Sequence, residues 1–136
     1  MKPVVLDCSV ALSWCFSDEA NAFSDDVLTY LRKNGALVPP LWSLEVTNGL
    51  LTAEKRKRIS LDGVLKFIEM FARLPIRVMS LSSNETFSGI FKIAYDCRLT
   101  TYDATYLYLA MRERSPLATL DKALREARKR YSLPEL

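Results

Sequence analysis

The sequence predicts an α/β protein built as an α/β/α sandwich, a three-layer fold in which helices cover both faces of a central, mostly parallel sheet. Short apolar runs alternate with longer segments whose apolar residues recur at helical spacing, so four or five strands are expected. Strands joined through helices run parallel, by right-handed crossovers. The 136 residues contain no repeat, low-complexity tract or linker, which favours a single domain over residues 1–136.

Four apolar runs are the expected strands, and turn residues bound them. The runs are residues 3–6, 36–38, 76–81 and 117–120. Asn34-Gly35 is a typical helix end just before the second run, and Pro39-Pro40 closes that run. Only residues 131–136 follow the last expected helix, with Pro134 among them, so a fifth strand is expected to be short or absent.

Helices are expected over the intervening segments. Their ranges are residues 10–16, 20–33, 42–57, a segment starting at Ser60, a segment starting at Ser82, 103–114 and 122–130. Ser60 is a typical N-cap, and Ser82 with Glu85 has the spacing of a capping box. The third and fourth helices are expected to form an antiparallel hairpin. Two of the later helices have apolar faces, formed by Leu61, Val64, Leu65, Ile68, Phe71 and Ala72 and by Phe87, Ile90, Phe91 and Ala94.

Composition removes several classes of catalytic site. The chain has no histidine, and therefore no Ser-His or Cys-His triad, no histidine general base and none of the common zinc sites. Cys8, Cys15 and Cys97 form no CxxC pair and are expected to be small buried hydrophobes. Any hydrolysis must rely on carboxylates, hydroxyls, lysine or a hard metal ion.

The chain is expected to be cytoplasmic and to have no membrane partner. No apolar run has the length of a membrane span. Asp7 interrupts the apolar N-terminal segment, which a single basic residue precedes, so this segment is not a signal peptide. Net charge is +3, from 19 basic and 16 acidic residues. If several acids gather in one pocket, the rest of the surface is more basic and suits a polyanion.

Four acidic residues far apart in the sequence are placed to meet at one rim of the sheet. Asp7 ends the first strand, Asp121 follows the fourth, Glu45 lies on the helix after the second, and Asp103 opens another helix. Ligands of open α/β sheets bind beyond the carboxyl ends of the strands. Each acid alone has a simpler explanation, as a turn residue, a solvated helix residue, a first-turn charge or an N-cap. Together they predict a shared site.

A shared site of carboxylates predicts a divalent metal. Mg²⁺ and Mn²⁺ prefer carboxylate oxygen and water. Close carboxylates repel one another, and a divalent ion removes that cost. Such an ion also makes a bound water nucleophilic and stabilises charge developing on a phosphate. We therefore expect Asp7, Glu45, Asp103 and Asp121 to be both metal ligands and catalytic residues of a nuclease that cuts RNA, with one or two ions bound.

Supporting roles are expected for polar residues near these acids. Ser9 and Thr119 lie two residues from the first and the last of the four acids, and Asn48 lies one helical turn after the second. Their side chains are expected to bond a ligating carboxylate or a bound water. A local cap or turn bond is the alternative for all three.

Two basic clusters are candidate RNA contacts. Both lie near expected helix C-termini, where the helix dipole favours cations, and that explanation is sufficient by itself. Phosphate contact along a substrate path is the functional explanation. The candidate RNA-binding residues are Lys55, Arg56, Lys57 and Arg58 in one cluster and Arg125 and Arg128 in the other. The aromatic residues fall mostly at core spacing, so no base-stacking surface is predicted.

These motifs resemble those of the PIN-domain ribonucleases, most closely the VapC-type toxins of toxin–antitoxin pairs. The matching segments are residues 4–9 (VVLDCS) with Trp14, 39–48 (PPLWSLEVTN), 99–107 (LTTYDATYL) and 118–121 (ATLD). Their order and spacing fit over nearly the whole chain, and the Thr-x-Tyr-Asp-Ala segment is the most specific piece. Members of this family often have a fifth strand, which this chain is not expected to form fully.

The resemblance implies a PIN-like fold and a Mg²⁺- or Mn²⁺-dependent endoribonuclease. The acidic residues of the family correspond here to Asp7, Glu45, Asp103 and Asp121, and its small hydroxyl to Ser9. Cleavage by a metal-activated water is expected to leave 5′-phosphate and 3′-hydroxyl ends. The resemblance also implies a homodimer and a cognate antitoxin whose tail blocks the site, in a heterotetramer or larger assembly. The hairpin over residues 42–73 is similar to the element that grips the antitoxin.

Two other functions remain open from the sequence. A phosphoacceptor signalling domain would use clustered acids and Mg²⁺ to accept a phosphoryl group on one Asp, and it needs a nearby lysine, for which Asp121-Lys122 is a rough match. A catalytically inactive module of this fold would bind RNA or protein without cleavage, and the presence of all the acids argues against it. No base-reading motif predicts which RNA is the target.

Overall fold

The computed structural model describes residues 1–136 and confirms the α/β/α sandwich. A four-stranded sheet of order β3-β2-β1-β4 forms the middle layer, and all neighbouring strands are parallel. The strands are β1 Val4–Leu6, β2 Ala36–Val38, β3 Ile76–Val78 and β4 Leu117–Ala118. They lie where the sequence predicted them, but the last two end earlier than expected, and residues 131–136 add no fifth strand.

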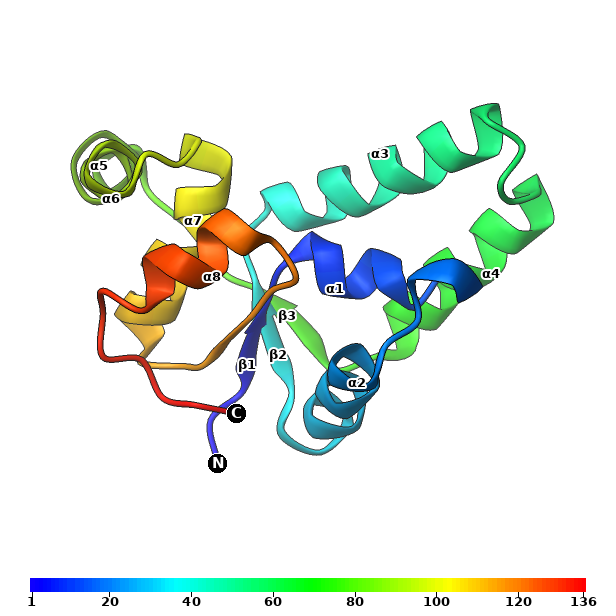
Figure 1. Ribbon diagram of the computed structural model, residues 1–136, viewed down its shortest axis with the longest axis horizontal. Helices are drawn as coiled ribbons and strands as arrows, with labels where there is room; N and C mark the ends of the chain where they lie inside the picture. The colour runs from blue at the N-terminus through cyan, green and yellow to red at the C-terminus, as the bar shows by residue number, and fades with distance from the viewer.

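Helices follow each strand. They are α1 Cys8–Ser13, the short turn η1 Ser17–Glu19, α2 Ala22–Asn34, α3 Leu41–Lys55, α4 Leu61–Arg73, α5 Ser83–Glu85, the π-helical turn η2 Thr86–Ile90, α6 Phe91–Cys97, α7 Thr101–Glu113 and α8 Lys122–Arg128. In Figure 1, α7 and α8 lie on one side of the sheet and α1 and α2 on the other, while the α3–α4 hairpin extends away from the sheet. Both termini lie near the amino ends of the strands (Figure 1).

Crossover geometry places several helix N-termini at one edge of the sheet. β1 pairs with both β2 and β4, so the carboxyl ends of these three strands are adjacent. The chain leaves that edge through α1, α3 and α8, which follow β1, β2 and β4. α7 leads into the amino end of β4 and therefore begins at the same edge. The predicted rim thus exists, and four helices start there.

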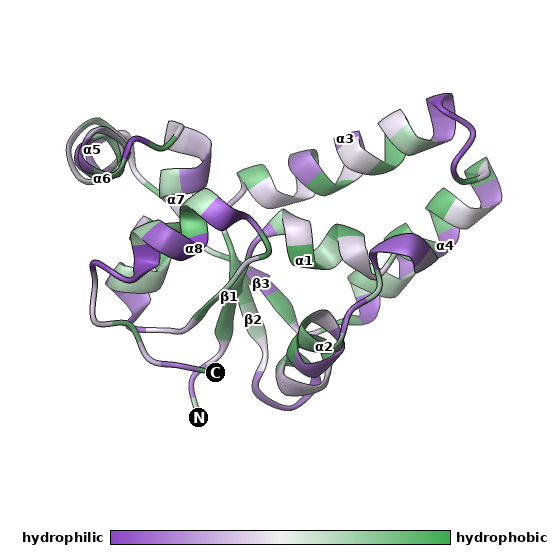
Figure 2. Cartoon of the chain, viewed as in Figure 1, coloured by the Kyte–Doolittle hydropathy of each residue, from purple (hydrophilic) through white to green (hydrophobic).

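The core lies on both faces of the central strands. All three residues of β1 are fully buried, as expected for a parallel strand covered on both sides. Figure 2 shows green strands in the middle and purple at the tip of the α3–α4 hairpin, where the chain is charged. Side-chain caps begin five of the helices, and these caps are Asn21, Ser60, Ser82, Thr100 and Asp121. The Ser82–Glu85 capping box is present as predicted.

Two expected apolar faces are only partly buried. Ile90 and Ala94 pack into the core, but Phe87 is 80% and Phe91 57% exposed. The stripe that packs inward is Ile90, Ile93 and Ala94, and residues 87 and 91 lie beside it rather than on it, because successive helical residues are about 100° apart. On α4, Val64 is buried while Leu61, Leu65 and Ile68 are exposed.

Of the cysteines, only Cys15 is a buried hydrophobe as predicted. Cys8 and Cys97 are half-buried and have polar neighbours, which corrects that expectation. The Sγ atom of Cys97 lies 3.7 Å from the Tyr131 hydroxyl and accepts a hydrogen bond from Arg130. None of the helices combines the length and the apolar character needed to cross a lipid bilayer.

Candidate active site

Asp7 lies at the centre of the rim and is almost completely buried. Its side chain is 3% exposed. The Oδ2 atom accepts two short hydrogen bonds, one from the Ser9 hydroxyl at 2.6 Å and one from the Thr119 hydroxyl at 2.7 Å. β1 ends at Leu6, so the strand delivers this carboxylate to the rim, and the N-terminus of α1 follows directly. Both supporting hydroxyls were predicted from the sequence, and both contact Asp7.

The two hydroxyls also fix the loop between β4 and α8. Ser9 Oγ accepts a hydrogen bond from the Leu120 backbone N–H at 2.9 Å, and Thr119 Oγ1 accepts one from the Asp121 N–H at 3.0 Å. Asp121 then caps α8, with its Oδ1 accepting from the Leu124 N–H at 2.8 Å. Because Oδ1 is used as a cap, Oδ2 is the Asp121 oxygen that remains available to another ligand. The N-cap explanation for Asp121 is therefore correct, and it leaves room for a second role.

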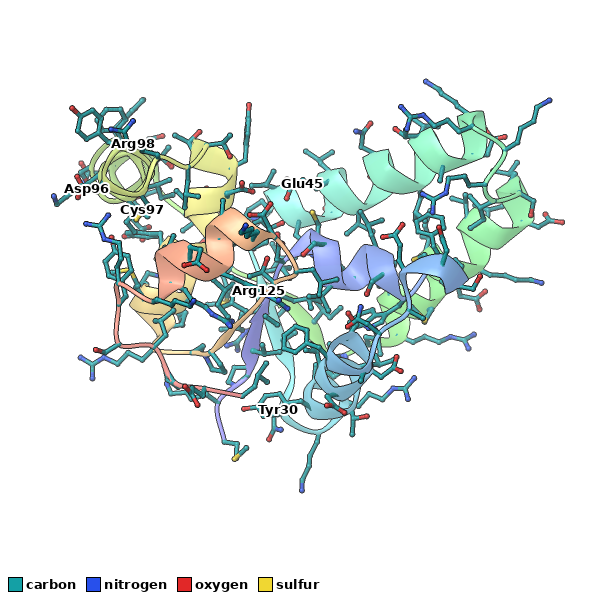
Figure 3. The ribbon with its side chains drawn as sticks, in the orientation of Figure 1. Tyr30, Glu45, Asp96, Cys97, Arg98 and Arg125 are labelled. Carbon is teal, nitrogen blue, oxygen red and sulfur yellow. The ribbon has the colours of Figure 1, made fainter.

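Glu45 reaches the site from the first turns of α3. Its Oε1 atom accepts a hydrogen bond from the hydroxyl of Tyr106, 2.5 Å away on α7. Burial raises the pKa of the Glu45 carboxyl, the Tyr106 hydrogen bond opposes this effect, the Asp7 charge adds to the rise, and a hydrogen bond from the Cys8 thiol opposes it. In Figure 3, Glu45 points toward the region above the sheet from which α7 and α8 begin. The solvated-helix explanation of Glu45 is thus wrong in this structure.

The pKa of Asp103 responds to burial and to the charges of the other acids in the cluster. It lies in the first turn of α7, whose cap is the Thr100 hydroxyl. Burial, followed by the charges of Asp121, Asp7 and Glu45, raises the pKa of Asp103 to about 6. The part of this shift that comes from like charges requires the other acids to lie nearby, because charge interactions decline with distance and with screening by water and salt. The structure therefore brings the four predicted acids to one rim.

Cys8 lies among these acids and was not assigned to the site from the sequence. Burial, and then the Asp7, Glu45 and Asp103 charges, raise the pKa of its thiol. The thiol therefore stays protonated, and it forms an uncharged wall of the site. The signal that could have found it is its place directly after Asp7 at the start of α1.

The donor set fits a hard divalent cation by its chemistry, although it does not form a closed cage. All the candidate donors are carboxylate or hydroxyl oxygens, which such ions prefer. No group of three or more acidic, cysteine or histidine side chains is close enough to hold an ion as the side chains stand. Mg²⁺ usually keeps several waters and binds through one or two carboxylates, so a preformed cage is not required. Asp7, Glu45, Asp103 and Asp121 would hold such an ion, directly or through water.

Asn48 is not joined to the cluster. Its side chain is exposed and makes no hydrogen bond within the protein. It lines an apolar groove of about 450 Å³ along the α3–α4 hairpin instead. One turn of helix separates it from Glu45, but that turn leads out of the rim toward the hairpin. Its predicted support of a carboxylate is not seen in the structure.

The two predicted basic clusters differ in how their side chains are engaged. Arg125 donates to the Thr119 carbonyl and lies over the Phe23 ring, and Arg128 donates to the Leu117 carbonyl. Arg58 forms ion pairs with acids of η1. The exposed side chains without a hydrogen bond or ion pair are Lys55, Arg56 and Lys57. They lie at the tip of the hairpin, about 15 Å from Glu45 along α3, since a helix rises about 1.5 Å per residue.

Comparison with known proteins supports the fold and nothing finer. No protein-family model matches the chain, and no curated protein matches it. Among solved structures, the chain is similar to the crystal structure of PAE2754 from Pyrobaculum aerophilum, with a TM-score of 0.64 and 19% sequence identity. The match covers 93% of this chain and 84% of that one. At this identity the likeness establishes the shared α/β/α architecture and leaves the chemistry to be argued from the site.

Proposed function

We propose that this protein is a metal-dependent endoribonuclease, and that it is the toxin of a VapBC-type toxin–antitoxin pair. The single observation that supports this most strongly is the convergence of four acids at the carboxyl edge of the sheet, where burial and then the charges of the other three raise the pKa of Asp103 to about 6. A protein gains no stability from placing like charges together. Such a cluster is therefore typical of a functional site that a cation completes.

The roles of the residues follow from their contacts. Asp7 is held rigidly by two hydroxyls and anchors the site, while Glu45 and Asp103 approach from the N-terminal turns of α3 and α7. Asp121 presents its remaining oxygen from the start of α8. A bound Mg²⁺ or Mn²⁺ ion, or a pair of them, would acidify a water molecule and offset the charge that develops on the scissile phosphate. The absence of histidine leaves these carboxylates as the groups that receive the proton.

RNA is the proposed substrate because its backbone is a polyanion that needs positive charge around an acidic site. The free cations Lys55, Arg56 and Lys57 lie beyond Glu45 on the same hairpin, at a distance of a few nucleotides. Such cations hold phosphates without reading sequence. A strand lying along α3 would thus meet the cations at one end and the carboxylates at the other.

The antitoxin is proposed to bind the groove along the α3–α4 hairpin. This groove begins next to the site at Leu44, which is 72% exposed, and continues toward the tip. Its apolar residues are Leu44, Leu51, Leu61, Val64, Leu65 and Ile68. Exposed apolar faces of this kind suit an amphipathic helix. A tail leaving the groove past Leu44 would reach the carboxylates, which supports a basic side chain as the blocking group.

The decisive test is RNA cleavage by purified protein with Mn²⁺, with and without EDTA. The parent should cleave only with the metal. Asp7→Asn and Asp103→Asn should lose cleavage while keeping the fold. At position 7 the Asn amide oxygen can still accept the Ser9 and Thr119 protons, and at position 103 the backbone N–H bond to the Thr100 cap is unchanged. Asp26→Asn, which changes an exposed acid of α2, is the matched control and should cleave like the parent. Equal cleavage by Asp7→Asn and the parent would remove the proposal, and stable labelling by acetyl phosphate would favour a phosphoacceptor instead.

The partner proposal is tested separately. The small protein encoded next to this chain, if it is an antitoxin, should copurify with the parent and inhibit cleavage. Leu51→Asp and Leu65→Asp should lose that binding and keep cleavage, since both residues are exposed in the free protein. Light scattering of the purified chain tests the proposed homodimer, and of the complex the heterotetramer or larger assembly. Copurification unchanged by both substitutions would exclude the groove as the binding surface.

A further inference from the structure

Tyr106 is a fully buried tyrosine whose hydroxyl has a single partner. It lies on α7, one helical turn after Asp103, and its exposed fraction is 0%. Its hydroxyl donates to Glu45 Oε1 and makes no other hydrogen bond. A buried hydroxyl without a partner is costly, so Tyr106 and Glu45 each restrict where the other lies. Residues three apart on a helix share a face, so α7 presents Asp103 and Tyr106 to the same region.

We propose that Tyr106 is the positioning residue for Glu45, holding this carboxylate so that its other oxygen faces the cation site. The hydrogen bond engages Oε1, so Oε2 is the oxygen that would bind a cation. This inference rests on the proposed metal-dependent function. Tyr106 itself contacts no substrate or metal, and it acts through Glu45.

The physical reason is the conformational freedom of glutamate. A Glu side chain has three rotatable bonds, and on the first turns of α3 the one other side-chain donor near Glu45 is the Cys8 thiol, which donates weakly. Burying and fixing such a side chain costs conformational entropy. The hydrogen bond from the Tyr106 hydroxyl already fixes Glu45 in the folded protein, so this entropy is lost on folding and not on cation binding. Groups that orient a metal ligand in this way typically change metal affinity or activity by about 10-fold to 100-fold when removed.

The arrangement also couples two elements that the site needs together. Glu45 is on α3 and Tyr106 on α7, and 61 residues separate them in the sequence. The bond therefore sets the spacing between the helix that presents Glu45 and the helix that presents Asp103. A purely structural role would be satisfied by ring packing alone, since the Tyr106 ring lies in the core.

The test is the affinity of the protein for Mn²⁺, measured by titration calorimetry, in Tyr106→Phe and the parent. Phenylalanine keeps the buried ring and removes only the hydroxyl. The dissociation constant should rise about 10-fold or more, and RNA cleavage at saturating RNA should fall with it. Tyr108→Phe is the matched control, because Tyr108 is also on α7 and its hydroxyl also donates to a glutamate, Glu85, at 2.8 Å. This variant should bind Mn²⁺ like the parent.

A double-mutant cycle separates positioning from a general loss of packing. In a Glu45→Gln background, Tyr106→Phe should cause no further loss of Mn²⁺ affinity, because the residue through which it acts is already changed. An equal loss in both backgrounds would overturn the positioning role, and so would parent-like Mn²⁺ affinity in Tyr106→Phe alone. If the parent itself neither binds Mn²⁺ nor cleaves RNA, the proposed function fails and this inference fails with it. If the parent does both and Tyr106→Phe is unchanged, this inference alone is overturned.

Discussion

Helix α7 contacts two glutamates through two tyrosines, and the two carboxyls are perturbed in opposite directions. Tyr106 donates to Glu45, and Tyr108 donates to Glu85. Burial raises the pKa of Glu45, and the Tyr106 bond opposes this only in part. The pKa of Glu85 is lowered to about 2, first by the backbone N–H of Ser82 and then by Tyr108 and by Arg112. Two tyrosines of one helix thus donate to glutamates whose pKa values shift in opposite directions.

The difference is the supply of positive charge. Glu85 closes a capping box and pairs with Arg112 at 3.0 Å, so every oxygen has a donor and the charge is balanced. The acids of the rim have hydroxyls and a few N–H groups but no arginine or lysine in contact. Glu85 joins α5 to α7 with its charge balanced by Arg112, whereas the rim has more acidic groups than cationic groups. A site that lacks a cation in this way is expected to respond to one.

The largest expected effect is on stability when a divalent ion is added. At about 100 times its dissociation constant, an ion that binds only the folded state adds about 2.7 kcal/mol. For a domain of this size that is about 10 °C in Tm. Calorimetry of the parent with Mn²⁺ against EDTA should show this rise, and Asp103→Asn should lose most of it. Glu85→Gln is the control and should retain the rise, since Glu85 lies outside the rim. Equal rises in Asp103→Asn and the parent would break the contrast between the two regions.

The next largest expected effect is on the Tm of the metal-free protein when Glu85 is replaced. Glu85→Gln loses the ion pair with Arg112 and weakens the capping box at Ser82. Tm in EDTA should therefore fall, while Asp103→Asn in EDTA should raise Tm because it removes a repelled charge. Thermal unfolding by circular dichroism compares the two variants directly. A fall in both would mean that the rim acids are as well compensated as Glu85.

The stability of the metal-free protein should depend on pH with opposite slopes for Asp103 of the rim and for Glu85. The folded-state pKa of Asp103 is about 6, above its ordinary 3.8, so the folded protein holds this proton longer and stability falls as pH rises through that window. The folded-state pKa of Glu85 is about 2, below its ordinary 4.5, so stability is present above 4.5 and is lost as pH falls toward 2. Stability in EDTA should therefore be greatest between about pH 4 and 5.

Single substitutions identify which slope belongs to which acid. Asp103→Asn should flatten the profile between pH 4 and 6, and Glu85→Gln should flatten it below pH 4.5. Thermal unfolding across the pH range in EDTA provides the measurement. If Asp103→Asn leaves the profile between pH 4 and 6 unchanged, the rim acids do not interact electrostatically.

Much of this contrast was visible in the sequence, because it depends on local signals. The Ser82–Glu85 spacing predicted the capping box, and the ends of the apolar runs predicted the rim at which Asp7 and Asp121 lie. Parallel crossovers place the carboxyl ends of the strands at one edge, whereas the order β3-β2-β1-β4 came only from the structure. The resemblance in the Thr-x-Tyr-Asp-Ala segment points to the same rim acids, but the comparisons leave that family assignment a prediction.

Long-range contacts were not visible. Tyr106 has the spacing of a core residue on α7, and its contact with Glu45 depends on how α3 and α7 approach each other. Phe87 and Phe91 also have the spacing of core residues, yet the core accepts only the adjacent stripe of Ile90 and Ala94. Helical periodicity gives the faces of a helix, but which apolar face is covered is decided by neighbours that are distant in the sequence.

The smallest expected effect concerns the cations of the hairpin, where engaged and free charges can be compared again. Arg58 pairs with Asp18 and Glu19 and lies over the Phe16 ring, while Arg56 has no such partner. Arg56→Ala should weaken RNA binding uniformly across sequences and reduce the salt dependence of log affinity by about 0.7, the value for one contact with a single strand. Cleavage at saturating RNA and Tm should not change, because Arg56 is exposed and far from the carboxylates.

Arg58→Ala should do the reverse, lowering Tm with little effect on the salt slope. Binding titrations at several salt concentrations with catalytically silent Asp7→Asn protein measure the salt slope, and thermal unfolding measures Tm. A Tm loss in Arg56→Ala without a change in salt slope would assign this arginine to the structure of the hairpin rather than to the substrate path.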